Sequence, residues 1–280
     1  MKLIADSGST KTDWCLVGDD GLRTFFTTEG LNPFFVDQTY IEASIKKGFP
    51  LGADQTKIDK VHFYGAGCQD SKTEIVQRAL RSFFTQADIY AELDLLGAAR
   101  GLLGNKPGFA AILGTGTNTC LYDGAEIEHK IESLGFLMGD EGSGSMMGKM
   151  LLSDFIRGRM PGPVAALFFE SYGKTPEQIM DEVYTSPLPN RYCATYVKFL
   201  DLADLEPLYV SGIVQQAFTA FFKNLVSAYP DYTSYSFNCI GSVGYHFADQ
   251  LRYTASEFGM STGKIISSLI VPLTDYHSLQ

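Results

Sequence analysis

Two glycine- and hydroxyl-rich turns, one in each half of the chain, constrain the fold more than any other feature. The first, DSGSTKT at residues 6–12, follows the apolar segment Leu3–Ala5. The second, LGTGTNT at residues 113–119, lies at the end of the apolar segment Phe109–Leu113. Because strand-like segments flank each turn, we expect two hairpins whose glycines leave backbone N–H groups uncovered. Either turn alone is typical of an ordinary tight hairpin, but the pair at matching positions favours two phosphate-binding loops.

The hydrophobic periodicity predicts the same order of elements in both halves, three consecutive strands and then alternating helices and strands. This repetition predicts an α/β protein built from two similar domains. In the first half we expect strands at Lys2–Asp6, Thr12–Val17, Thr24–Thr28, Val61–Tyr64 and Ile89–Ala91, and helices at Asp37–Lys47, Ser71–Phe84 and Asp94–Leu103. In the second half we expect strands at Phe109–Leu113, Asn118–Tyr122, Glu126–Ile131, Ser236–Ile240 and Lys264–Leu269, a mainly helical stretch from Gly142 to Tyr229, and a helix at Tyr245–Ser256.

The cluster Gly-Asn-Lys-Pro-Gly at residues 104–108 is the best candidate for a linker. It separates an N-terminal domain, residues 1–106, from a C-terminal domain, residues 107–280. A length of 280 residues also favours two domains over one.

Composition excludes several classes of function. The net charge of −10, with no basic run, argues against nucleic acid as a partner. No run of about 18 apolar residues is present to cross a membrane, and Leu3–Ala5 is too short for a secretory signal. The five cysteines are widely spaced and form no Cys-x-x-Cys pair, so we expect reduced core thiols in a cytoplasmic protein. The sequence leaves open whether the protein forms a homodimer.

Four motifs occur in order: DSGSTKTD at 6–13, GLN at 30–32, LGTGTN at 113–118 and MGDEGS at 138–143. Together they resemble the N-acetylglucosamine kinase family, part of the superfamily of actin, heat-shock ATPases, hexokinases and acetate kinase. That family is related to the ATPase activators of benzoyl-CoA reductase and hydroxyglutaryl-CoA dehydratase. The resemblance has good spacing as far as about Gly148. It implies an α/β fold of two ribonuclease-H-like (actin-like ATPase) domains around a nucleotide and sugar cleft.

The resemblance also implies ATP and Mg²⁺ as cofactors. Asp6 matches the carboxylate that helps to hold Mg²⁺, usually through water, as suits a cation that keeps much of its hydration shell. Lys11 matches a phosphate contact, although a solvated turn lysine explains that residue equally well. The remaining expected ATP contacts are Ser9, Thr10 and Thr12 in the first loop, Gly114, Thr115 and Gly116 in the second loop, and Gly212, Gly241 and Ser242 near the adenosine.

Phosphoryl transfer to a sugar hydroxyl needs a carboxylate that accepts the hydroxyl proton. Asp94 is the candidate for this catalytic base, because it lies at a strand-to-helix junction where the kinase family carries its base in an Asp-Ala-x-x-Ala-like pattern. Aspartate is also a favoured helix N-cap, so the residue type alone does not decide its role. Glu92 is the competing acid.

For the sugar, the family uses an Asn after a Gly and acids from the Met-Gly-Asp-Glu-Gly loop. Asn32 and Asp140 are the matching positions, with Thr115 and Gly116 beside them as further substrate contacts. Amides and carboxylates suit polyol recognition because they donate to or accept from adjacent hydroxyls in fixed geometry. An acid at the start of a helix can instead compensate the helix macrodipole, and this alternative applies to Asp140.

The implied activity is an ATP-dependent kinase that phosphorylates the 6-hydroxyl of N-acetylglucosamine or a related amino sugar. The alternatives are a nucleotide-switched ATPase that activates a partner protein, a kinase for N-acetylmuramic acid or glucosamine, and a sugar-sensing relative without turnover. Two departures bear on the substrate: the glycine pair of the family is reduced to Ser-Leu-Gly-Phe at 133–136, and residues 272–277 lack the Gly/Ala-rich returning helix of longer relatives.

Overall fold

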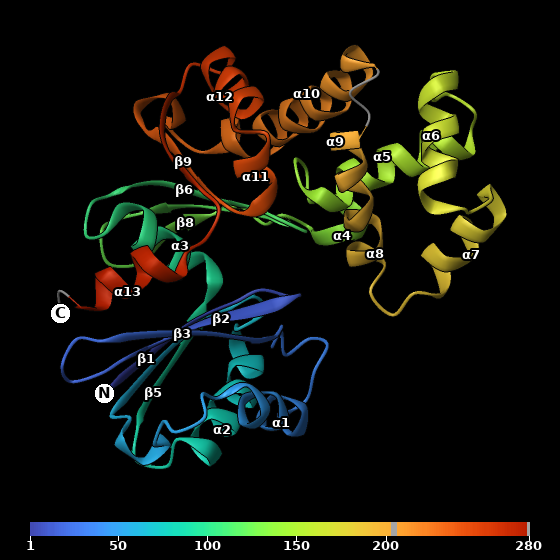
Figure 1. Cartoon of the computed structure of the whole chain (residues 1–280). Coiled ribbons are helices and arrows are strands. Elements are labelled where there is room, and N and C mark those ends of the chain that lie inside the picture. Colours follow the sequence, from blue (N-terminus) through green and yellow to red (C-terminus); the bar gives the residue numbers. More distant parts are fainter. Residues whose placement is uncertain (203–205, 279–280) are drawn as a thin grey trace. The chain divides into compact units, whose positions relative to one another are not determined.

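A computed structural model describes residues 1–202 and 206–278 of the chain. The chain divides into two compact units (Figure 1). Unit 1 contains Met1–Pro107, Tyr122–Ile127 and the described residues from Ser268 onward, and unit 2 contains Gly108–Leu121 and the described residues of Glu128–Ser267. The domain boundary after residue 106 stays a prediction. The two compact units differ from the predicted domains because Tyr122–Ile127 and the described residues from Ser268 onward belong to unit 1.

The sheet of unit 1 has five strands in the order β3-β2-β1-β4-β5. Strands β1 to β3 form an antiparallel meander, while β4 and β5 add to β1 in parallel. The expected elements of this half are all present, with ends that differ by one or two residues. They are β1 (Lys2–Ser7), β2 (Lys11–Val17), β3 (Arg23–Glu29), α1 (Gln38–Gly48), β4 (Lys60–Gly65), α2 (Asp70–Phe83), β5 (Asp88–Leu93) and α3 (Asp94–Leu103).

Helices cover both faces of this sheet (Figure 1). Alternate residues of β4 show the two sides, because successive side chains of a strand point to opposite faces. Val61 and Phe63 join the buried cluster that contains α1 and α2 residues such as Ile45 and Leu80. His62 and Tyr64 point to the other face, where they contact His277 of the last helix, α13 (Ile270–Ser278).

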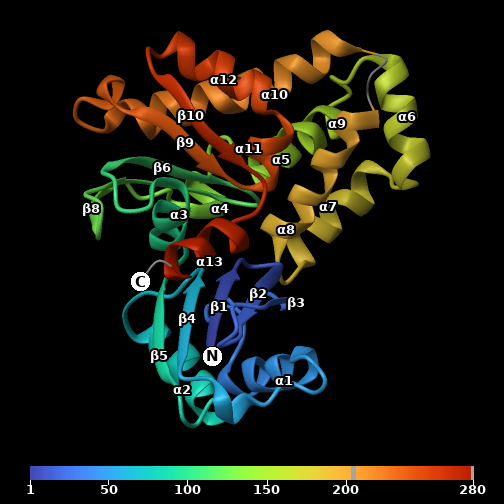
Figure 2. The ribbon, with the colours of Figure 1, turned by 60° about the vertical axis from the view of Figure 1, so that its left-hand side comes forward.

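The sheet of unit 2 has the order β10-β9-β6-β7-β8, which repeats the strand order of unit 1 when it is read from β8. Figure 2 shows β9 and β10 side by side, with α10 and α12 packed together beyond them. One large apolar cluster connects the sheet with α5, α10 and α12. The strands are β6 (Gly108–Leu113), β7 (Thr117–Tyr122), β8 (Ile127–Lys130), β9 (Ser236–Ile240) and β10 (Ser261–Ile266); the helices are α4 (Gly135–Met138), α5 (Gly144–Ile156), α6 (Gly162–Tyr172), α7 (Pro176–Thr185), α8 (Pro189–Thr195), α9 (Phe199–Leu202), α10 (Pro207–Asn224), α11 (Ser242–His246) and α12 (Ala248–Glu257).

The structure confirms the repeated α/β plan but corrects three elements near the C-terminus. The helix expected at Tyr245–Ser256 is two helices, α11 and α12, separated at Phe247. Strand β10 ends at Ile266, three residues before the expected end, and its exposed polar residues hide the strand pattern. A helix, α13, is present where no returning helix was expected; Pro272 is compatible with it because a helix's first turn has no internal partner for its N–H groups.

A pair of stacked histidines contributes to the packing of α13 against the sheet of unit 1. The rings of His277 and His62 lie 3.9 Å apart, and the hydroxyl of Tyr64 bonds His277 Nε2 at 2.9 Å. His277 is only 3% exposed, and Lys2 Nζ donates to its carbonyl at 3.0 Å. Burial, together with nearby positive groups including Arg100, lowers the pKa of His277 to about 3 and that of His62 to about 4.

These low pKa values predict that unit 1 loses stability in mild acid. An unfolded histidine titrates near pH 6.5, so below that pH the unfolded chain binds protons that the folded chain excludes. The stabilising effect is complete above about pH 6.5 and disappears as the pH falls toward about 4. We expect the free energy of unfolding to fall by about 1–2 kcal/mol per histidine between pH 7 and pH 5.

Urea unfolding followed by the fluorescence of Trp14, the single tryptophan, measures this change within unit 1. His277→Gln should reduce the pH dependence, whereas substitution of an exposed histidine of β8, His129→Gln, should have a much smaller effect. An equal pH dependence in wild type and His277→Gln would contradict the assignment to the stacked pair.

Candidate functional site

Three aspartates gather at one end of the unit 1 sheet. The strand register pairs Asp6 of β1 with Asp13 of β2, and it aligns Ser7, Gly65 and Leu93 across β1, β4 and β5. Helix α3 follows β5 without a loop, so Asp94 is both the residue after the strand and the first residue of the helix. The sheet therefore brings the predicted metal ligand and the predicted base to the same edge.

The pKa of Asp6 reflects the proximity of the other two aspartates. Burial, with the neighbouring carboxylates of Asp94 and Asp13, raises the pKa of Asp6 to about 7. Lys11 opposes this effect, and its ammonium forms an ion pair with Asp13 at 2.7 Å. The side chain of Lys11 is mostly exposed, and its contact with a phosphate stays a prediction. The edge carries more negative than positive charge, an arrangement that favours a bound cation.

The first loop is a tight hairpin turn that is stabilised by hydrogen bonds within the turn and between the two residues at its base. Gly8 N donates to Lys11 O at 2.9 Å and closes the turn. The hydroxyls of Ser7 and Thr12 are buried and bond each other at 2.7 Å, so the hydroxyl of Thr12 lies beneath the loop. Gly30 packs against the loop so closely that a Cβ there would lie 2.3 Å from the carbonyl oxygen of Ser9. A glycine is needed at this position because any side chain would displace the loop backbone.

The predicted sugar residue Asn32 lies next to this loop. Its side chain is 7% exposed, and its Nδ2 donates to Ser9 Oγ at 3.1 Å. Its Oδ1 accepts from Phe34 N at 3.0 Å, which fixes the orientation of the amide. Within unit 1 the structure thus joins the Gly-Leu-Asn motif to the loop predicted to bind phosphate.

The two candidate bases differ in their surroundings. Asp94 Oδ1 accepts from Leu95 N at 2.8 Å, while Leu93 occupies the N-cap position of α3. Asp94 is close enough to Asp6 to raise the pKa of that residue. Glu92 is an exposed residue whose pKa is raised by burial of its carboxylate, with Arg100 opposing that shift. Of the two candidate bases, therefore, Asp94 and not Glu92 lies close to Asp6 at the acidic edge.

A magnesium ion fits this edge as a hydrated cation. Hard carboxylate oxygens are the ligands that Mg²⁺ prefers, and Asp6 and Asp13 offer them at an edge where three aspartates face one lysine. In residues 1–202 and 206–278, no three His, Cys, Asp or Glu side chains come close enough together to bind a metal ion directly. Magnesium usually keeps several waters and binds proteins through one or two carboxylates, which agrees with this arrangement.

The second loop, in unit 2, packs against the acidic loop that precedes α5. The first turn of α5 donates to the loop, from Gly144 N to Gly114 O at 2.8 Å and from Ser145 N to Thr115 O at 3.0 Å. Thr117 N donates to Asp140 Oδ1 at 3.1 Å. The structure therefore brings the predicted phosphate loop and the predicted sugar acid together within unit 2.

Asp140 is a buried carboxylate in a left-handed backbone conformation. It is 6% exposed and has a φ of 57°, which Asp tolerates better than most residues. Burial raises the pKa of Asp140. A Cβ on Gly116 would lie 3.1 Å from Asp140 Oδ1, so the glycine leaves room for this buried carboxylate. The neighbouring acid, Glu141, already accepts from Asn224 Nδ2 at 2.9 Å.

The residues predicted to contact the adenosine lie in two places. Gly241 follows β9 with a φ of 128°, and a Cβ there would lie 2.3 Å from Leu113 O, at the start of the second loop. Ser242 is the first residue of α11 and is exposed. Gly212 lies within α10, on its exposed side, where a Cβ would have no atom within 4 Å. The structure thus joins Gly241 to the second loop, while the role of all three residues stays a prediction.

The segment before Asp140 keeps a glycine-like backbone despite its altered sequence. Leu134 and Gly135 have φ values of 58° and 64°. A left-handed φ strains a leucine, so the backbone here has the shape of a glycine pair although one glycine is replaced. The side chain of Leu134 is exposed as a result.

Sequence reasoning did not give Asp13 a role, yet the register places it opposite Asp6. The signal that could have found it is the hairpin itself, because residues equally distant from a tight turn face each other across an antiparallel pair.

Solved structures similar to this chain share its whole fold. A protein from Porphyromonas gingivalis, described as a proposed N-acetylglucosamine kinase, is 37% identical over 100% of this chain and 99% of its own, with a TM-score of 0.94. A second proposed N-acetylglucosamine kinase, from Chromobacterium violaceum, is 17% identical over 98% of both chains, with a TM-score of 0.68. A ROK family glucokinase from Streptomyces griseus, solved with glucose and AMPPNP, is 15% identical over 99% of this chain and 98% of its own, with a TM-score of 0.59. No protein-family model and no curated protein sequence matches the chain.

Proposed function

Because the chain belongs to the N-acetylglucosamine kinase family of the actin-like ATPase superfamily, we propose that it is an ATP-dependent kinase for an amino sugar. The proposed reaction transfers the γ-phosphoryl group of ATP to the 6-hydroxyl of N-acetylglucosamine or a close relative. The observation that carries the proposal is the acidic edge of unit 1, where Asp94 lies beside Asp6 and the first loop. A kinase of this type needs a carboxylate base close to its phosphate site.

In the proposed reaction Asp94 accepts the proton of the sugar hydroxyl. The hydroxyl oxygen forms a bond to the γ-phosphorus, the bond from that phosphorus to the bridging oxygen of ADP breaks, and the proton moves to Asp94. The hydrogen bond from Leu95 N to Oδ1 helps to fix the carboxylate of Asp94 at the start of α3. The products are a sugar 6-phosphate and ADP.

We propose a phosphate-binding role for each glycine-rich loop, the first in unit 1 and the second in unit 2. Backbone N–H groups and the hydroxyls of Ser9, Thr10 and Thr115 can donate to phosphate oxygens, while Lys11 offers a positive charge. Asp6 and Asp13 would hold the magnesium ion, whose chemistry is to offset the negative charge of the phosphates.

The sugar contacts that we propose are Asn32 in unit 1 and Asp140 in unit 2. Both side chains are nearly buried and each has one oxygen fixed by a backbone N–H, so they recognise hydroxyl and amide groups in set directions. Glucose lacks the acetamido group and would leave at least one of these buried groups without a partner.

The activator-ATPase alternative requires cysteines that can hold an iron–sulfur cluster between two subunits. All five cysteines lie in the described part of the chain, where they are buried and form no disulfide. Burial raises the pKa of Cys68 to about 12 and that of Cys193 to about 11, so neither thiol readily gives the thiolate that a cluster needs. These properties favour the kinase.

A coupled assay of ADP release, with ATP, Mg²⁺ and a panel of sugars, tests the proposed activity. We expect kcat/KM for N-acetylglucosamine to exceed that for glucose by about 10- to 100-fold, the effect of about 1–3 kcal/mol for an unpaired buried polar group. Glucosamine and N-acetylmuramic acid complete the panel and would reveal either alternative substrate. ATP hydrolysis that no sugar stimulates would instead favour the activator, and a preference for glucose would contradict the roles of Asn32 and Asp140.

We also propose that the kinase works in the cytoplasm, where ATP is available and its buried thiols stay reduced. No helix in the described part of the chain is long and apolar enough to cross a membrane.

A further inference from the structure

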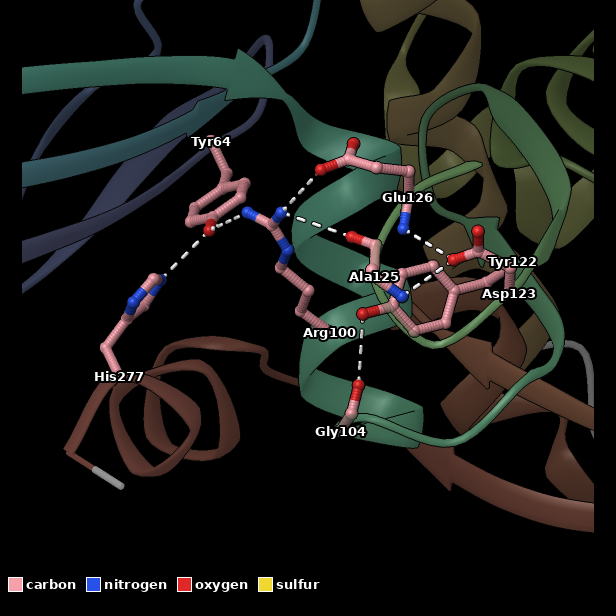
Figure 3. Close-up of polar contacts among 8 residues, drawn as sticks. All are labelled: Tyr64, Arg100, Gly104, Tyr122, Asp123, Ala125, Glu126 and His277. Atoms are coloured by element: carbon pink, nitrogen blue, oxygen red, sulfur yellow. Dashed lines mark hydrogen bonds and ion pairs between the residues drawn. The ribbon is translucent and has the colours of Figure 1, made fainter. Parts of the chain in front are cut away.

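Arg100 of α3 is the centre of a polar cluster that the proposed reaction does not use (Figure 3). Its Nη1 donates to the hydroxyl of Tyr64 at 2.8 Å. On the other side, its Nη2 donates to Ala125 O at 3.2 Å and to Glu126 Oε1 at 3.3 Å. The side chain of Arg100 is only 16% exposed and that of Glu126 is 69% exposed, so the bond to Tyr64 is the most shielded from water of the three.

The partners of Arg100 come from distant parts of the sequence. Tyr64 belongs to β4 of the first half, whereas Ala125 and Glu126 form the turn between β7 and β8. Tyr64 in turn bonds His277 of α13 at 2.9 Å, as Figure 3 shows. The turn and α13 are the two later segments that join unit 1. Arg100 therefore connects them with β4 of the sheet and with its own helix.

Helix α3 packs closely against β4 on one side and against the segment just before α13 on the other. A Cβ on Gly97 would lie 2.8 Å from Tyr64, and a Cβ on Gly101 would lie 2.4 Å from Leu269, just before α13. These two glycines let Tyr64 and α13 approach the helix backbone, and Arg100 bonds the far end of the Tyr64 side chain. A shift of α3 along its axis would break the fit and the hydrogen bonds together.

The shape of arginine matters at this place. A planar guanidinium spreads its donors over two sides, whereas a lysine ammonium carries its three donors on one nitrogen and cannot span partners on opposite sides. The guanidinium also lies 5.8 Å from the ring of Tyr64 and 5.7 Å from that of Tyr276, so aromatic rings from β4 and α13 hold its plane. A lysine here would keep the charge but lose the simultaneous connection.

We propose that Arg100 is a positioning residue for the reaction: by joining β4, the β7–β8 turn and α13, it fixes α3 and so the carboxylate of Asp94, the first residue of that helix. This inference rests on the proposed role of Asp94 as the base. A displaced carboxylate lowers the rate of proton transfer without changing the groups that bind ATP or sugar, because none of the partners of Arg100 belongs to the two loops.

The test compares Arg100→Lys, Tyr64→Phe and a matched surface control, Arg252→Lys, whose arginine pairs with Asp249 on exposed α12. We expect kcat to fall about 10-fold in Arg100→Lys and about 3-fold in Tyr64→Phe, with KM for ATP and sugar within about twofold of wild type. Arg252→Lys should match wild type in all three constants. Circular dichroism and Trp14 fluorescence check that each variant is folded.

A purely stabilising role predicts a lower unfolding midpoint and an unchanged kcat per folded molecule. A folded Arg100→Lys with kcat within about twofold of wild type would overturn the proposal. If Arg100→Lys fails to fold, Tyr64→Phe decides, because it removes one hydroxyl and keeps the ring; an unchanged kcat there overturns the proposal as well. Failure of the proposed function is separate, since it would appear as wild-type protein that releases no ADP in response to any sugar.

Discussion

Asp94→Asn is expected to lower kcat by about 100-fold or more while the protein stays folded and binds ATP and sugar with nearly wild-type affinity. Asparagine has the same shape and can still accept the hydrogen bond from Leu95 N, so α3 should begin as it does in the wild type. It cannot accept the proton of the sugar hydroxyl at neutral pH, so the loss should appear in kcat. Steady-state kinetics with separate binding titrations of ATP and sugar measure this division.

Glu92→Gln is the matched control for that variant. Glu92 lies two residues before Asp94, but it belongs to the exposed side of β5, and Arg100 rather than Asp6 is the charge it faces. We expect its kcat to stay close to the wild-type value. Near-wild-type turnover in Asp94→Asn, with a large loss in Glu92→Gln, would move the role of base to Glu92.

Asp140→Asn is expected to raise KM for the sugar by about 10- to 100-fold, with a small effect on KM for ATP. Asparagine also tolerates the left-handed backbone of this position, so the loop should keep its conformation. The substitution removes a charged acceptor from a buried place where sugar hydroxyls would donate to it. Hydrogen bonds to a buried charged group are worth about 1.5–3 kcal/mol, which sets the expected size of the change.

Glu141→Gln serves as the control for Asp140→Asn, because Glu141 already has Asn224 as its partner. Its KM for the sugar should stay within about threefold of wild type. A sugar KM unaffected by Asp140→Asn, in a folded protein, would remove Asp140 from the sugar site.

Much of the fold could be predicted from local patterns. Short apolar segments marked β1, β2, β4 and β6, and the repeated hairpins indicated two copies of one sheet plan, which both sheets show. The strand-to-helix junction at Asp94 could also be predicted, since a strand pattern changes there to a helical one. These features depend on neighbours in sequence, which one chain reveals directly.

The remaining features depend on contacts between distant residues. The helix α13 escaped prediction because Pro272 and the polar Thr274 and His277 look like a loop, whereas burial against His62 and Tyr64 decides the conformation. The cluster around Arg100 joins three segments that are far apart along the chain, and no local pattern marks such a meeting. Asp13 gained its place only from the strand register.

The central claim is that this protein moves a phosphoryl group from ATP to the 6-hydroxyl of an amino sugar. The most direct measurement is nuclear magnetic resonance of the products formed from ATP, Mg²⁺ and N-acetylglucosamine by the purified protein. We predict a sugar phosphate whose phosphorus couples to the protons on carbon 6, formed in equal amount with ADP. Release of inorganic phosphate with unchanged sugar would contradict the claim, and so would a phosphate attached at another position of the ring.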